Sequence, residues 1–440
     1  MTSPIAEKRG VGDLAFFLVA IVVGLVTGLL GTALRFGDAN AHVWPAFVAR
    51  LTGDRTALHL VIVGLTGAVM VTAAVWLVRT FAPEAAGSGI QEIEGAMVDE
   101  REVRWARILP VKFFGGLLSL GSGLVVGREG PTMHIGAAVA KAMSGWFNLS
   151  RLDLHALLAA GAGAGLAAAF NAPLAGVLFV LEETRKQFPH SFRSYSAVIL
   201  ATVASVILSS IIAGGEPLMK MDATAIPLNL LPAFAGLGVV LGLAGAAFNT
   251  SLVWSLDRAQ ALGQRFSFYL LPAVAGFAVG ILLVLFPDAT RGGETLSVEL
   301  VAKNLPLVTI AGLVAARFLM TMVSYSTGVP GGIFAPILGL ATAIGLFYGA
   351  VLEFAFALPP GASVALAAAA MGGLFAATVQ APLVGIILVA ELTGAYSLVL
   401  PVMLTTVVAR IVAVSLGTRP IYEVLLERAL ALSGRPTGER

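Results

Sequence analysis

The pentapeptide Gly127-Arg128-Glu129-Gly130-Pro131 places two opposite charges between two apolar segments. Its glycines let the backbone turn and approach a ligand closely, and Pro131 suits the first turn of a helix, where the missing N–H costs nothing. A helix that begins here presents free N–H groups, which attract anions. We expect the carboxylate of Glu129 to occupy these amides, from which a mobile anion or protonation would displace it. The alternative is an interhelical loop in which Arg128 and Glu129 form a local salt bridge.

Two other glycine-rich breaks offer neutral donors to a ligand. In Gly87-Ser88-Gly89-Ile90 a hydroxyl lies between two glycines, and it can donate to an anion without carrying charge. An ordinary Gly-Ser turn is the alternative. The segment Gly328-Val329-Pro330-Gly331-Gly332-Ile333-Phe334-Ala335-Pro336 has no charged side chain, and its donors are the backbone N–H groups of Ile333 and Phe334. A proline-glycine hinge would give the same pattern.

Several ionisable side chains lie in or beside apolar segments. Lys112 is such a cation, and inside a membrane it needs a carboxylate partner, for which Glu94 and Glu183 are candidates. Snorkelling of its ammonium to the interface is the alternative. Glu182 and Glu183 end another apolar run, and neighbouring positions on a helix diverge by about 100°. We therefore expect one of these two carboxylates to face a water-filled vestibule and the other to face inward.

The composition indicates a membrane protein. Of the 440 residues, 58% are hydrophobic and 12% are charged, and stretches such as Leu14 to Leu34 are long enough to cross a bilayer as helices. The strict alternation that a transmembrane barrel requires is absent. The sequence therefore predicts an all-α polytopic membrane protein, with residues 1–440 forming a single transmembrane domain within the lipid bilayer.

Other function classes have little support. The formal net charge is only +2, which gives no basis for a nucleic-acid partner. Cysteine is absent and the five histidines show no ligand spacing, so we expect no metal site and no cofactor. The adjacent glutamates form no constellation with a nucleophile or a metal, so we do not expect an enzyme.

An internal repeat connects the breaks. A shift of 209 residues superposes Asn171-Ala172-Pro173-Leu174-Ala175-Gly176 on Gln380-Ala381-Pro382-Leu383-Val384-Gly385, and Glu182 on Glu391. A shift of 205 superposes the glycine and proline that bracket Glu129 on Gly332 and Pro336. Two halves with broken helices at corresponding places are typical of transporters whose site lies at the repeat interface near the midplane. We assign about 14–213 to the first repeat and about 228–416 to the second, and helix N-termini that converge from both halves favour an anionic substrate.

These motifs resemble the CLC family of chloride channels and proton-coupled chloride antiporters, especially its bacterial antiporters without cytoplasmic regulatory domains. The resemblance spans essentially the whole chain, because the three breaks occur in the family's order and Ile421-Tyr422 follows Pro420 near the end. It implies the CLC-type fold, in which two inverted-topology repeats bring broken helices to a midplane anion site. It also implies a multi-pass protein of the cell membrane, the inner membrane of a bacterium, that forms a homodimer with a pore in each subunit. Segments near Leu181 and Val399 are the expected subunit contacts.

The resemblance also implies an anion site. It places chloride between the hydroxyls of Ser88 and Tyr422 and the amides of Ile333 and Phe334. Serine at position 88 resembles the chloride-preferring members. The family's first motif normally ends in proline, whereas Gln91 stands here, which costs backbone rigidity at the start of a helix and leaves the pose of Ser88 and the anion selectivity open.

The proton route is implied in the same way. Glu129 resembles the external gate, which occupies an anion site when ionised and carries the proton when protonated. Glu183 resembles the internal proton-transfer glutamate of the antiporters, with Glu182 beside it near the water route. Family channels generally lack a carboxylate at the position of Glu183.

The leading hypothesis is therefore a secondary transporter that exchanges chloride for protons. A passive, proton-gated chloride channel on the same fold is the second hypothesis, and it differs in whether a chloride gradient moves protons uphill. A cation-coupled symporter of organic anions, which also uses broken helices and repeats, is the third. Chloride binding in the absence of sodium would count against the symporter.

Overall fold

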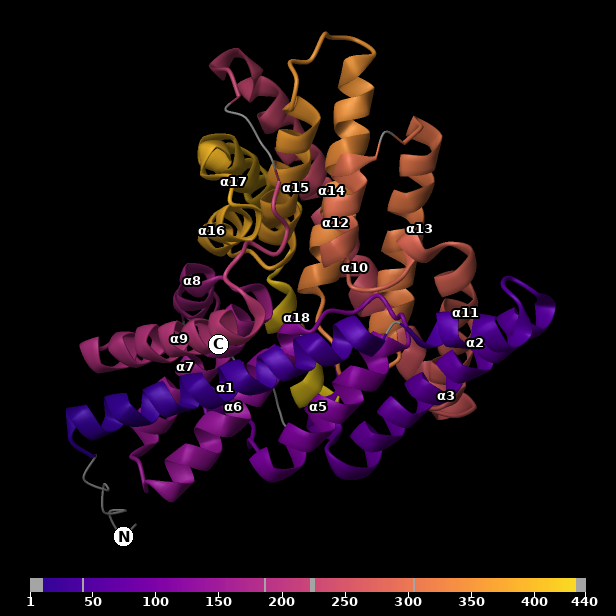
Figure 1. Cartoon of the computed structure of the whole chain (residues 1–440). Helices are drawn as coiled ribbons and strands as arrows, with labels where there is room; N and C mark the ends of the chain where they lie inside the picture. Colours follow the sequence, from indigo (N-terminus) through magenta and orange to yellow (C-terminus); the bar gives the residue numbers. More distant parts are fainter. Residues whose placement is uncertain (1–10, 42, 186, 222–225, 304, 433–440) are drawn as a thin grey trace.

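The computed structural model describes residues 11–41, 43–185, 187–221, 226–303 and 305–432, and the regular structure in these ranges is helical. Figure 1 shows the arrangement of the helices. The α-helices are α1 (Asp13–Ala41), α2 (Trp44–Thr52), α3 (Ala57–Phe81), α4 (Ile90–Met97), α5 (Trp105–Gly121), α6 (Glu129–Trp146), α7 (Arg151–Phe170), α8 (Pro173–Glu183), α9 (Phe192–Ala213), α10 (Leu231–Arg265), α11 (Leu270–Leu285), α12 (Glu294–Ala302), α13 (Leu307–Ser326), α14 (Phe334–Glu353), α15 (Ala362–Thr378), α16 (Pro382–Thr393), α17 (Val399–Ser415) and α18 (Ile421–Leu432). Short 3-10 turns are η1 (Pro83–Ala85), η2 (Leu228–Leu230), η3 (Pro287–Ala289) and η4 (Tyr396–Leu398).

The helices confirm the predicted all-α membrane class. Within the described ranges, 8 helical segments are long and apolar enough to cross a membrane. Others are too short to span, because a crossing needs about 20 residues: α4 has 8 residues, α8 has 11 and α16 has 12. The terminal N–H and C=O groups of such short helices need partners wherever water does not reach them.

The two halves of the chain lie in different parts of the molecule. In Figure 1 the helices of the first half, in indigo to magenta, lie mostly below those of the second half, in orange to yellow. The halves interlock, because α11 packs along α3 and α8 packs against α16. Small residues allow close approach within the first half as well: a Cβ added at Gly24 or Gly28 of α1 would overlap the backbone of α9.

The three glycine-rich breaks come from both halves of the chain and lie against one another. Gly127 and Gly332 exchange backbone hydrogen bonds of 2.9 and 2.7 Å, so α6 and α14 begin side by side. Gly87 donates to the carbonyl of Val329 and accepts from the N–H of Gly331, both at 3.0 Å. These bonds satisfy backbone groups that would otherwise be buried without partners, and they fix the relative position of the breaks.

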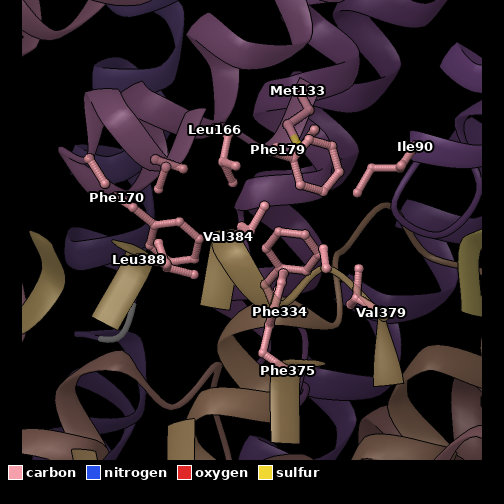
Figure 2. Close-up of a cluster of buried hydrophobic side chains, with 14 of the residues drawn as sticks. Ile90, Met133, Leu166, Phe170, Phe179, Phe334, Phe375, Val379, Val384 and Leu388 are labelled. Atoms are coloured by element: carbon pink, nitrogen blue, oxygen red, sulfur yellow. The ribbon is translucent and has the colours of Figure 1, made fainter. Parts of the chain in front are cut away.

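An apolar core reaches directly to this meeting point. Figure 2 shows Phe334, the first residue of α14, close to Phe179 of α8 and Phe375 of α15. The ring of Phe334 lies 5.6 Å from that of Phe179 and 4.7 Å from that of Phe375, in the tilted and edge-on arrangements that aromatic rings prefer. The start of α14 is therefore held by packing as well as by backbone hydrogen bonds.

Candidate functional site

Glu129 is the first residue of α6, and its side chain is completely buried. Its Oε1 accepts hydrogen bonds from the N–H of Phe334 at 2.7 Å and of Ala335 at 3.3 Å. These amides belong to α14. The carboxylate also has a hydrogen bond with its own backbone N–H at the start of α6, so the prediction that Glu129 would occupy the amides of its own helix was incomplete, because those of α14 hold it as well. The reason is the pairing of Gly127 with Gly332, which brings the start of α14 opposite the carboxylate.

The Glu129 carboxylate is tightly enclosed, and its hydrogen bonding is incomplete. A Cβ added at Gly127 or Gly332 would overlap the carboxylate oxygens of Glu129, so glycine is required at both positions for this pose. The other oxygen, Oε2, is buried and has no hydrogen-bond partner in the structure. A buried polar atom without a partner costs about 1–3 kcal/mol, which makes this pose one that protonation or movement can relieve.

Arg128 does not form the local salt bridge with Glu129 that was the alternative interpretation. Its guanidinium pairs with the carboxylate of Glu294 and lies 3.5 Å from that of Asp38. It also donates to the carbonyl of Ala169 at 3.1 Å. All three partners are distant in sequence, and the side chain fixes the start of α6 without neutralising Glu129.

A cavity of about 620 Å³ lies beside Glu129. Arg128 and Glu294 line it, and so do Gly127 and Ala335, which touch or hold the carboxylate. We call it the Arg128 cavity.

Ser88 precedes α4 and is completely buried. Its hydroxyl donates to Oε1 of Gln91 at 2.9 Å, and its Oγ accepts from the N–H of Ile90 at 3.3 Å. The backbone N–H of Ser88 donates to the hydroxyl of Tyr325 at 3.4 Å. Gly130 packs on the same residue, since a Cβ added there would lie 2.6 Å from the Cα of Ser88. The glycine-rich break at Ser88 is therefore in direct contact with the break at Glu129.

Lys112 has a different role from either predicted one. The side chain is completely buried, so it does not snorkel, and its ammonium donates to the carbonyls of Gly87 at 2.7 Å and Ser88 at 3.0 Å rather than to the carboxylate of Glu94 or Glu183. Lys112 belongs to α5, and its ammonium holds the segment Gly87-Ser88-Gly89-Ile90 in place.

Tyr422 lies in the first turn of α18 and is completely buried. Its ring centroid is 5.9 Å from that of Phe334, and its hydroxyl has no hydrogen-bond partner in the structure. Ile333 and Phe334 are completely buried too. A buried hydroxyl normally has a partner, so this one is a donor that an anion beside Phe334 could use.

A second cavity, of about 780 Å³, reaches the site beside Ser88. Gly87, Gln91 and Tyr325 line it. We call it the Gln91 cavity. Arg101 and Arg104 also line it, each in a two-point ion pair with a carboxylate, Glu92 and Glu84 respectively.

Glu182 and Glu183 both line a smaller cavity of about 230 Å³, together with Glu94. One was predicted to face water and the other to face inward. Both side chains reach this cavity because α8 ends at Glu183, and Glu183 is the more deeply buried of the two. Glu182 also accepts hydrogen bonds from the N–H groups of Leu383 at 3.2 Å and Val384 at 2.9 Å, in the first turn of α16.

Sequence reasoning missed some of these neighbours. Tyr325 touches Ser88, but a tyrosine in an apolar helix gives no distinguishing signal. Glu294 was missed for a similar reason, because its pairing with Arg128 links residues far apart in the chain. Within the described ranges, no group of three or more histidine or carboxylate side chains could hold a metal ion.

Comparison with known proteins places this geometry in a family. The sequence model described as "Voltage gated chloride channel" matches residues 67–414. The chain is 41% identical over 434 residues to the H(+)/Cl(-) exchange transporter ClcA of Vibrio parahaemolyticus, covering 96% of this chain and 91% of that protein. It is 40% identical over 430 residues to the ClcA of Citrobacter koseri, covering 96% and 90%.

Solved structures agree in fold. The crystal structure of a slow cyanobacterial Cl-/H+ antiporter superposes with a TM-score of 0.90 at 36% identity, covering 96% of this chain and 99% of that one. A CLC-type fluoride/proton antiporter superposes with a TM-score of 0.74 at 20% identity, covering 91% and 95%, which is a likeness of fold.

Proposed function

Because this chain belongs to the voltage gated chloride channel family, the CLC family, we propose that it exchanges chloride for protons across a membrane as a secondary transporter. One observation carries the proposal: the carboxylate of Glu129 occupies the N-terminal amides of α14, with one oxygen bonded and the other buried without a partner. Helix N-termini bind anions, and a free chloride would suit the same N–H groups. The carboxylate and the chloride therefore compete for one place.

Protonation decides this competition. An ionised Glu129 accepts charge-assisted hydrogen bonds from Phe334 and Ala335, and a neutral carboxylic acid accepts weaker ones. The unpartnered Oε2 is the oxygen open to a proton. When Glu129 takes a proton it leaves the amides to chloride, and when chloride leaves, the ionised side chain returns. The passage of chloride is in this way coupled to the movement of protons in the opposite direction.

The anion site proper is made of neutral donors. We assign it to the hydroxyls of Ser88 and Tyr422 and the amides of Ile333 and Phe334. The unpartnered hydroxyl of Tyr422 beside the ring of Phe334 supports this assignment. Neutral donors bind chloride weakly enough to release it, as conduction requires.

Glu183 is the proposed internal proton station. It lines the small cavity together with Glu94 and Glu182, so protons can reach it from water. Glu182 has a second role, because its carboxylate holds the start of α16. The alternative function, a passive channel, would need no proton station at this place.

The organisation of the chain is also a proposal. We assign 14–213 and 228–416 to two inverted-topology repeats within one transmembrane domain, and 417–440 to a C-terminal segment that carries Tyr422, of which 433–440 lie outside the described residues. The contact of α8 with α16 across the boundary supports it.

We further propose a homodimer that uses the face formed by α8, α9, α16 and α17, which lie together at the left of Figure 1. Large apolar side chains are exposed along it, including Leu174, Ile207, Leu383 and Ile411, and the predicted contacts near Leu181 and Val399 belong to the same helices. In mild detergent, light scattering should give a protein mass of twice the 45.2 kDa of one chain. A mass of one chain would exclude the dimer under those conditions.

The deciding experiment is proton movement in sealed proteoliposomes of the purified protein. A chloride gradient drives the flux, the membrane potential is clamped, and Glu129→Gln serves as control. Uphill proton movement that vanishes in the control is the expected result. Rapid chloride flux without proton movement would make the protein a channel and remove the role assigned to Glu183.

A further inference from the structure

Gln91 controls the hydroxyl of Ser88 in this structure. It is the second residue of α4, it is 9% exposed, and its Oε1 accepts the hydroxyl proton of Ser88 at 2.9 Å. We propose that Gln91 sets the affinity and selectivity of the anion site by holding this proton away from the anion. The inference rests on the proposed function, because it takes Ser88 as a ligand of chloride.

Counting protons at Ser88 shows why Gln91 matters. A serine hydroxyl has one proton to donate and two lone pairs. Here the proton goes to Gln91, and Oγ already accepts from the N–H of Ile90 at 3.3 Å. The hydroxyl of Tyr325 also interacts with the side chain of Ser88. Oγ therefore has no free proton to offer an anion. Chloride can be coordinated by Ser88 only after the hydroxyl turns away from Gln91 and loses that hydrogen bond.

The backbone of Ser88 is held by other groups. Lys112 donates to the carbonyls of Gly87 and Ser88, and the N–H of Ser88 donates to Tyr325. These contacts come from α5 and α13 and do not involve the carboxamide of Gln91. Replacing that carboxamide should therefore redirect the hydroxyl while leaving the backbone of Ser88 in place.

The position of Gln91 also gives it access to the ion route. It lines the Gln91 cavity together with Gly87 and Tyr325, which are neighbours of Ser88. The competition for the hydroxyl proton therefore operates at the entrance to the anion site. Because chloride is small and firmly hydrated, it needs strong donors in exchange for its water, and a weakened donor penalises it more than a large, weakly hydrated anion such as nitrate.

Removing the carboxamide of Gln91 removes the acceptor that competes with chloride for the hydroxyl proton of Ser88. Gln91→Leu keeps the approximate volume and removes the acceptor, so the hydroxyl is free to donate to chloride. We expect chloride to bind about fivefold more tightly, which corresponds to ~1 kcal/mol, and the chloride-to-nitrate flux ratio to rise. Gln91→Met is the second variant if the leucine variant does not fold.

The test is a double-mutant cycle measured by calorimetric titration of chloride into the purified protein. Wild type, Gln91→Leu, Ser88→Ala and the double variant are compared, with Gln260→Leu as a matched control because Gln260 lines the same cavity. We expect Ser88→Ala to weaken binding, Gln91→Leu to tighten it, the control to leave it unchanged, and Gln91→Leu to have no effect in the Ser88→Ala background.

The other outcomes separate this inference from the proposed function. If Ser88→Ala weakens binding while Gln91→Leu changes nothing, or changes it equally in both backgrounds, the role of Gln91 is wrong and the anion site stands. Weaker binding in Gln91→Leu also overturns the inference, because the carboxamide would then be a direct ligand. If Ser88→Ala leaves chloride binding unchanged, the assignment of Ser88 to the anion site is itself wrong, and the role of Gln91 is withdrawn with it.

Discussion

The protein places glutamate carboxylates on helix N-termini in two different ways. Glu182 at the end of α8 binds the first turn of α16, and Glu391 near the end of α16 binds the first turn of α8. Glu129 likewise binds the first turn of α14. The chemistry of carboxylate and amide is the same in all three, but the completeness of the hydrogen bonding differs.

Glu182 and Glu391 form a reciprocal pair that uses every carboxylate oxygen. Each oxygen of Glu391 accepts one backbone N–H, from Leu174 at 3.0 Å and Ala175 at 2.8 Å, and Glu182 does the same on the other helix. Their sequence positions are related by the repeat. Both carboxylates also complement the positive end of a helix dipole, so they tie α8 and α16 together.

Glu129 uses one oxygen for both amides and leaves the other buried without a partner. Such a pose is strong enough to close the site and is not optimised to persist. The comparison teaches that a carboxylate on a helix N-terminus does not by itself identify a gate. We propose that the unsatisfied oxygen marks Glu129 as the carboxylate that leaves its amides, whereas the fully bonded Glu182 and Glu391 remain on theirs.

The largest effect should come from Glu129→Gln. A glutamine is neutral and has no proton to exchange at neutral pH, so chloride should move through the protein while chloride-driven proton transport falls to zero. Proteoliposome flux with chloride and pH electrodes measures both together. If the variant still pumps protons, the incomplete hydrogen bonding that separates Glu129 from Glu182 and Glu391 has no functional meaning.

A smaller but still large effect is expected for Glu183→Gln. The substitution removes a proton acceptor from the small cavity and leaves the donors around the anion untouched, so proton movement should fall strongly while chloride transport is retained. The same flux assay reports both quantities. Unchanged proton pumping would remove Glu183 from the route.

How far the sequence could predict this site depends on the distance between partners. The helix start at Glu129 was predictable because glycine, charge and proline act locally on the backbone. The long apolar helices were predictable from the apolar runs themselves, since the stretch from Leu14 to Leu34 lies within α1. Local signals therefore located the breaks.

The partners of the charged residues were not predictable. Glu129 binds amides more than 200 positions later in the chain, and Arg128 pairs with Glu294, because backbone pairing of Gly127 with Gly332 brings these segments together. Lys112 binds carbonyls, which every residue has, so no sequence pattern marks them. The repeat indicated that the two halves meet, but it does not specify which donor faces which acceptor.

The smallest effect, and the sharpest check of the comparison, should come from Glu391→Gln. A glutamine keeps one oxygen acceptor and turns an NH₂ group toward the second backbone donor, so one hydrogen bond and the charge at the helix end are lost. We expect the free energy of unfolding to fall by about 1–2 kcal/mol, seen as a lower melting temperature in detergent, with chloride-to-proton coupling unchanged. Glu182→Gln should lower stability by a similar amount. If Glu182→Gln also reduces proton transport while Glu391→Gln does not, Glu182 serves the proton route from the small cavity as well as holding the start of α16. The two carboxylates would then be equivalent in structure but not in function.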